Sequence, residues 1–195
     1  MFNYKIQFLL FSLIIACGIT SCREAYTPKP PAYFRIDYPE HAYQHYDSSC
    51  NFVFDYPIYA TLEDDKDRNS EPCWFNIVYT PFDARLHLSY KRVENLEHFF
   101  ILTKDSRELV YKHTVKADAI RENLILTDQE GVSGKLYELD GSTATALQFF
   151  VTDSLQHFLR GSLYFNSQIN RDSMDPIIDF LTVDIKHMIN SLEWK

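Results

Sequence analysis

Cysteine is the residue type whose surroundings in this chain most directly suggest chemistry. Cys22 ends the segment Ile19-Thr20-Ser21-Cys22, which follows an apolar run over residues 8–16. A run this short, preceded by a lysine, is typical of a secretory signal peptide and too short to span a membrane. Small residues followed by a cysteine predict cleavage before Cys22 and attachment of a diacylglycerol to its thiol. The alternative is an ordinary export signal that happens to end near a cysteine.

The other cysteines suggest one disulfide. Cys17 directly adjoins the apolar run and would leave with the signal, so Cys50 and Cys73 form an even pair in an exported protein. If the first three strands formed a meander, both cysteines would start strands at the same end of the sheet. A bridge closing this loop of about 23 residues would contribute about 3 kcal/mol in the chain-entropy model. The alternative is a pair of small buried thiols.

The histidines are the next candidates for chemistry, and none has the neighbours that a site requires. His41 and His45 could share one face of a helix, but no third metal ligand lies nearby. His87 falls on the polar face of an expected strand, which predicts a solvent-facing residue. His113 ends an expected helix, without a marked nucleophile for acid–base or covalent catalysis.

Sequence motifs of common active sites do not occur. There is no G-x-S-x-G, H-E-x-x-H, C-x-x-C or Walker loop, and the chain has only 5 glycines for phosphate-binding turns. Asp65, Asp67 and Asn69 match the first ligands of a calcium loop, but Ser70 and Asn76 replace its glycine and its closing glutamate. We therefore expect an exposed loop there, and a protein that is not an enzyme and holds no cofactor or metal.

Length and charge limit the classes of partner. The chain has 195 residues with a formal net charge of -8, and its signal segment carries only Lys5 as a charge. An acidic body argues against nucleic acid as a partner. It also argues against adsorption to anionic lipid, so the expected membrane link is the acylated cysteine. Aromatic residues make up 15% of the chain, which suits an exported β-rich domain.

Three regions are expected along the chain. Residues 1–21 are the lipoprotein signal peptide, and residues 22–49 are a proline-rich tether with a lead-in segment. Thr27-Pro28-Lys29-Pro30-Pro31 favours extended polyproline structure. Residues 33–39 are too apolar for a free linker and are expected to dock on the domain or on a partner. Residues 50–195 form a single globular domain of ordinary size.

The pattern of apolar residues predicts an α+β domain. It has a largely antiparallel sheet of about seven to eight strands, one mid-chain helix and one C-terminal helix. The first helix is expected over residues 96–116 with Leu96, Phe99, Phe100 and Val110 near one face, and the second starts at Asp175 and Pro176. This order resembles the PsbP/Mog1-type sandwich. The expected strands cover residues 52–56, 58–62, 73–80, 84–91, 123–127, 135–139, 144–152 and 157–165.

Several stretches together resemble the gliding-motility lipoprotein GldD family of Bacteroidota. The resemblance implies a cell-envelope lipoprotein that is required for gliding motility and is associated with the type IX secretion machinery. It brings no known cofactor, substrate or catalytic residue. The stretches are Lys29-Pro30 with Tyr33-Phe34-Arg35-Ile36-Asp37-Tyr38-Pro39-Glu40, residues 111–118 (YKHTVKAD), residues 152–158 (TDSLQHF) with 161–165 (GSLYF), and Leu192-Glu193-Trp194-Lys195.

Two hypotheses of function follow. The first is a non-catalytic assembly lipoprotein, facing the periplasm, whose partners are other gliding or secretion proteins of the envelope. Exposed aromatic residues would bind these partners, with Tyr33, Phe34 and Phe158 as candidates. The alternative is a periplasmic module for a small ligand or metal, with a pocket between sheet and helix and His113 or His157 as polar contacts.

Overall fold

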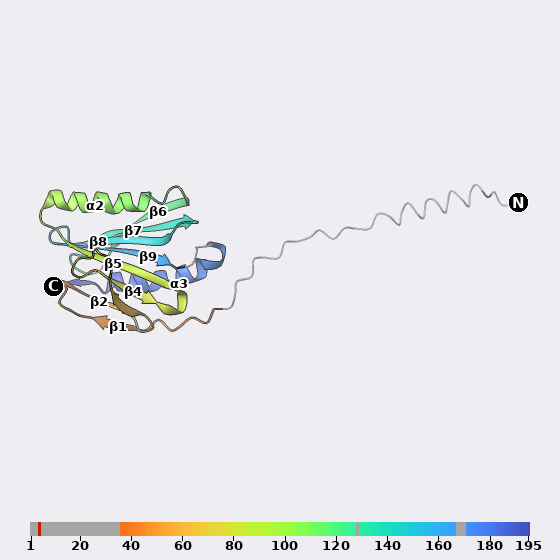
Figure 1. The fold of residues 1–195 in the computed structure, drawn as a ribbon, viewed down its shortest axis with the longest axis horizontal. Coiled ribbons are helices and arrows are strands. Elements are labelled where there is room, and N and C mark those ends of the chain that lie inside the picture. The colour runs from red at the N-terminus through yellow and green to blue at the C-terminus, as the bar shows by residue number, and fades with distance from the viewer. Residues whose placement is uncertain (1–3, 5–35, 128, 167–170) are drawn as a thin grey trace. The chain divides into compact units, whose positions relative to one another are not determined.

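The computed structural model describes Tyr4 and residues 36–127, 129–166 and 171–195, which are coloured in Figure 1. The rest of the predicted signal peptide, the predicted lipidation site Cys22 and the aromatic candidates Tyr33 and Phe34 lie outside the described residues. Among the described residues, no helix combines the length and the apolar character that crossing a membrane requires.

The centre of the fold is a seven-stranded sheet in which every neighbouring pair is antiparallel. Its order is β3-β4-β5-β9-β8-β7-β6, so the late strand β9 lies between β5 and β8. With two helices beside it, this sheet confirms the predicted α+β class and its largely antiparallel pairing. The strands are β3 (Thr61–Asp64), β4 (Phe75–Tyr79), β5 (Ala84–Arg92), β6 (Ala117–Leu126), β7 (Ser133–Gly141), β8 (Thr145–Thr152) and β9 (His157–Phe165).

A second sheet has three strands, which come from both ends of the domain. In it β2 (Phe52–Pro57) pairs on one side with β1 (Tyr43–Tyr46) and on the other with β10 (Glu193–Trp194). The expected meander of the first three strands is therefore wrong. Alternation of side chains identifies β2 as a strand, but it does not identify the strand's partner.

The helix α3 (Arg171–Asn190) covers one face of the main sheet. Its buried residues, among them Leu181, Ile185 and Met188, share one core with Phe52 and Phe54 of β2 and with inward residues of the main strands. The predicted apolar stripe is present, but the helix begins at Arg171 and not at Asp175. Pro176 lies inside the helix, where its missing N–H removes one backbone hydrogen bond near the start.

The helix α2 (Leu96–Tyr111) packs against a separate, smaller core. Figure 1 shows α2 on the opposite side of the main strands from α3, β1 and β2. Asn95 caps its start by accepting a hydrogen bond from the His98 amide at 2.9 Å. Residues 112–116 form turns and not the predicted last turn of helix, because His113 and Thr114 donate to carbonyls three residues back. The core beneath α2 contains Val93, Val110, Tyr137, Leu139, Phe150 and Phe158.

Candidate functional site

The segment around His41, just before β1, is fastened to α3 at Asp184. The Asp184 side chain is fully buried and accepts hydrogen bonds from His41 Nδ1 at 2.6 Å, from Tyr43 Oη at 2.9 Å and from Tyr59 Oη. Burial and the bond to Asp184 raise the pKa of Tyr43 to about 12 and that of Tyr59 further. Both tyrosines therefore stay protonated and remain donors at neutral pH. The contact holds the polypeptide just before β1 against the C-terminal helix.

A second carboxylate holds the next part of the same segment. Asp55 Oδ1 lies 2.8 Å from His45 Nδ1, and its Oδ2 lies 3.8 Å from His187 Nε2. The His187 ring also stacks on Tyr43 with 3.6 Å between ring centroids. His41 and His45 therefore have different carboxylate partners, and they lie on an extended segment and not on a helix. The described residues include no group of three or more His, Cys, Asp or Glu that could hold a metal ion.

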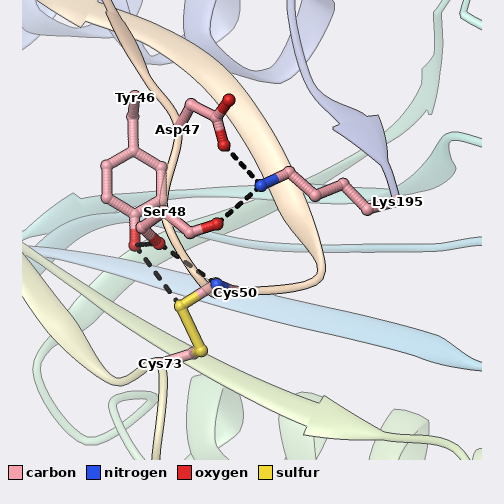
Figure 2. Close-up of polar contacts among 6 residues, drawn as sticks. All are labelled: Tyr46, Asp47, Ser48, Cys50, Cys73 and Lys195. Carbon is pink, nitrogen blue, oxygen red and sulfur yellow. Dashed lines mark hydrogen bonds and ion pairs between the residues drawn. A yellow bond between two sulfur atoms is a disulfide. The ribbon is translucent and has the colours of Figure 1, made fainter.

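A disulfide joins the two sheets at the opposite end of β2. Cys50, which precedes β2, forms a disulfide with Cys73, which precedes β4 (Figure 2). Ser48 Oγ accepts from the Cys50 amide and donates to the Tyr46 hydroxyl, which in turn lies 3.4 Å from Cys50 Sγ. The bridge therefore connects strands of different sheets and not two strands of one meander.

The C-terminal residue closes the same corner. Figure 2 shows Lys195 Nζ between the carboxylate of Asp47 and the backbone carbonyl of Ser48, to which it donates at 2.6 Å. The Lys195 amide also donates to the Asn51 carbonyl at 3.0 Å. The final residue therefore extends β10 along β2 and ties the C-terminus to the segment between β1 and β2.

Phe158, the one described residue among the three predicted partner contacts, is not on the surface. Its side chain is 3% exposed and stacks on Phe150 with ring centroids 5.1 Å apart, in the core beneath α2. This prediction is wrong. The alternation along β9 shows that Phe158 faces away from Leu159, but not that α2 covers that second face.

The two histidines of the predicted pocket are not brought into one site. His157 is buried, contacts Tyr90 Oη at 2.9 Å and stacks on Trp194, and burial lowers its pKa. His113 is half-buried after α2, and its pKa is lowered by burial and then by the charge of Arg160. A small-ligand module with His113 or His157 as a polar contact therefore stays a prediction.

The exposed side of α2 carries an apolar patch that the sequence pattern did not predict. Val110 and Ser106 are buried and Phe99 and Leu102 pack on the core beneath them, so the buried face repeats at residues 99, 102, 106 and 110. Leu96, Phe100 and Ile101 lie outside that face and are 66%, 60% and 48% exposed. These three residues, called the α2 patch below, line one shallow depression with Glu97 and Lys104.

Comparison with known families identifies the chain. A family model described as gliding motility lipoprotein GldD matches residues 23–194. The chain belongs to the GldD family. The resemblance seen in the sequence is thereby confirmed over nearly the whole chain, and a GldD-family lipoprotein is a membrane-anchored envelope protein associated with gliding motility.

The other comparisons concern curated proteins and solved structures. No curated protein matches this GldD-family chain. Among solved structures, the chain is similar to the solution structure of cyanobacterial PsbP (CyanoP) from Synechocystis sp. PCC 6803. The identity is 12% and the TM-score is 0.42, over 80% of this chain and 95% of that chain.

Proposed function

We propose that the chain is a non-catalytic, lipid-anchored component of the gliding apparatus that binds partner proteins in the cell envelope. The family match over residues 23–194 is the observation that carries this proposal. The partners would be other gliding proteins and components of the associated type IX secretion machinery. The domain would help to assemble or stabilise that machinery from the periplasmic side of the membrane.

The anchor of this proposal is Cys22. Cleavage before Cys22 would leave an acylated residue at the start of the tether, and each CH₂ group that enters the bilayer adds about 0.8 kcal/mol of attachment. Asp184 and Asp55 fasten the stretch from His41 to His45 to the domain. In this arrangement, pulling on the anchor would load the domain through α3 and β2.

The α2 patch is the proposed partner surface. Isolated exposed apolar residues are ordinary, but a group on one helix face that includes a phenylalanine is typical of protein-binding surfaces. Phe100 lies between Leu96 and Ile101, and Glu97 and Lys104 add charge at the edge. This surface would replace the predicted contact at Phe158, which is buried.

The proposal also accounts for the side chains most able to do chemistry. His41 and Asp184 form the best acid–base pair, but the same carboxylate accepts from two tyrosines and fastens the lead-in segment. His45 and His157 are likewise engaged with Asp55 and Tyr90. Each of these contacts has a structural role, which supports a binding protein over an enzyme.

Recovery of partners from the native envelope tests this proposal. We expect wild-type protein to co-purify with gliding or secretion components, and Phe100→Glu to lose them while its unfolding midpoint stays unchanged. Leu155→Glu is the control, because Leu155 is also exposed (74%, against 60% for Phe100) but lies in the β8–β9 turn. The Cys22→Ala variant should no longer associate with the membrane and should no longer co-purify with the partners. Equal recovery by Phe100→Glu and wild type would contradict the α2 surface.

A further inference from the structure

A row of polar side chains crosses the middle of the main sheet. Asn76, His87, Ser162 and Gln148 are cross-strand neighbours on β4, β5, β9 and β8 in turn. Asn76, Ser162 and Gln148 are buried, with Gln148 only 1% exposed. Their sequence neighbours on the same strands, such as Ile77, Leu86 and Leu163, point into the core under α3. The row therefore occupies the other face of the sheet, at positions where packing alone would favour apolar residues.

Arg160 adds an unbalanced charge to this row. Its Nη2 donates to Gln148 Oε1 at 2.6 Å, and Ser162 Oγ donates to the same oxygen at 3.4 Å. Arg160 makes no ion pair with a carboxylate of the described residues, although burial is strong enough to lower its pKa. A guanidinium in such surroundings costs stability unless an anion accompanies it.

Several polar atoms on this face of the sheet, Arg160 Nε among them, also lack partners within the described parts of the chain. They are Arg160 Nε, Gln148 Nε2 and Asn76 Oδ1, and all three are buried. Folded proteins leave few buried polar atoms unsatisfied, because each costs about 1–3 kcal/mol. Such departures from fully satisfied packing are expected at functional sites.

Part of this row borders a cleft of about 350 Å³, but Gln148 and Asn76 do not line it. Arg160, Ser162 and His87 line it together with Trp74 and Tyr164, and Asp65 also borders it. The volume lies at the lower end of the range for small-molecule sites. Burial, and then the charges of Arg85 and Arg160, lower the pKa of His87, so His87 is neutral at pH 7 and leaves Arg160 as the positive charge of the site.

We propose that this cleft binds a small organic anion whose carboxylate pairs with Arg160. Arg160 lines the cleft, and its planar guanidinium matches a carboxylate in geometry. Trp74 and Tyr164 provide aromatic walls for the organic part of the ligand. The site is separate from the α2 patch, so it stands or falls independently of the proposed partner binding.

The two tryptophans of the chain make the test direct. Trp74 borders the cleft, whereas Trp194 stacks on His157 and is not among the residues that line it, so its indole signal serves as an internal reference. We would titrate the full lipidated protein in detergent micelles with benzoate and follow the two indole N–H signals by NMR. The proposal predicts a saturable shift of Trp74 alone, and none with the uncharged isostere benzamide.

Variants then assign the site to Arg160. Arg160→Gln should abolish the benzoate shift. Arg160→Lys should weaken binding by roughly tenfold, because a lysine keeps the charge but lacks the paired N–H donors of the guanidinium. Arg121→Gln, which removes the same charge from the exposed strand β6, should bind like wild type. Arg160→Gln should also unfold at an unchanged or higher temperature, since it removes a buried charge that has no acidic partner.

Four results would overturn the proposal. The first is a Trp74 signal that does not saturate with benzoate. The second is an equal response to benzamide, and the third is a response to inorganic phosphate without one to benzoate. The fourth is an unchanged benzoate shift in Arg160→Gln or Arg160→Lys, whichever of the two variants folds.

Discussion

Asp184 shows how much one buried carboxylate can organise. It receives donors from His41, Tyr43 and Tyr59, which come from the segment before β1, from β1 itself and from the turn before β3. A charged acceptor strengthens each of these hydrogen bonds, and loss of the charge would leave three donors facing a weaker acceptor. The sequence separation of 143 residues between His41 and Asp184 explains why no local pattern could predict the pair.

Asp184→Asn tests this role by removing the charge while keeping the shape. We expect the free energy of unfolding to fall by about 3 kcal/mol, since hydrogen bonds to charged groups contribute more than neutral ones. Urea unfolding at pH 7 measures the change. Asp179→Asn, on an exposed position of the same helix, should alter stability by less than about 0.5 kcal/mol. A loss as small for Asp184→Asn would contradict the role assigned to Asp184.

Asp153 gives a pH-dependent prediction. Burial favours its neutral form, but backbone N–H groups of His157, Gln156 and Leu155 donate to Asp153 Oδ1 and hold its pKa below the ordinary value. A pKa that is lower in the folded than in the unfolded chain stabilises the protein above the unfolded value, near 4, and this contribution is lost as the pH falls through the folded pKa.

Asp153→Ala should therefore cost about 1–2 kcal/mol at pH 7, because it removes the acceptor of the β8–β9 turn. The difference in unfolding free energy between wild type and variant should shrink steadily below about pH 4. Urea denaturation from pH 7 to pH 3 measures it. A difference that stays constant with pH would show that the ionised carboxylate does not stabilise this turn.

At the scale of elements, the disulfide is the covalent connection between the two sheets. It ties the start of β2 to the segment before β4, where Tyr46, Ser48 and Lys195 also meet (Figure 2). The strands β1 and β10 have only four and two residues, so hydrogen bonds alone give the small sheet little independent stability. The bridge should therefore matter most for the attachment of this sheet.

Replacing both Cys50 and Cys73 with alanine should lower the free energy of unfolding by about 3 kcal/mol. The reason is that the bridge closes a 23-residue separation and so restricts the unfolded chain. Urea unfolding of the oxidised protein with and without a reductant gives an independent measurement. The free energy of unfolding of the double variant should be the same with and without the reductant. Equal stability of oxidised and reduced wild type would mean that the bridge does not form or does not stabilise the fold.

The sequence was sufficient to predict most elements but not their partners. Regular alternation in β5, β8 and β9 and the apolar stripe of α3 identified these elements within a few residues, because side-chain period reflects local backbone geometry. The strand β1 was missed because it is polar at its two central residues. The separation of β2 into its own sheet depends on pairing with the distant β10, which no local pattern encodes.

The candidate site was harder to predict than the fold. The buried face of α2 follows residues 99, 102, 106 and 110, and the serine at position 106 weakens the apolar signal. Phe100 was therefore expected in the core, although it is exposed. His87 was expected to face solvent, but it is half-buried, and only the cross-strand register shows that it lies beside Ser162.

At the scale of the whole molecule, the proposed arrangement consists of a lipid anchor, a tether and a domain with two separate surfaces. The net charge of -8 disfavours direct adsorption to anionic lipid, so the domain should depend on Cys22 for its place in the envelope. The α2 patch and the Arg160 cleft lie on different elements, α2 and the β4–β5–β9–β8 face. Partner binding and ligand binding can therefore be tested separately.

Photo-crosslinking in living cells tests the central claim most directly. A photoreactive amino acid would replace Phe100 in one strain and Leu155 in another, with equal amounts of membrane-bound protein in both. The account predicts crosslinks from position 100 to gliding or type IX secretion components, and their absence at position 155 and in a Cys22→Ala background. No crosslink at position 100, or the same crosslinks at both positions, would contradict it.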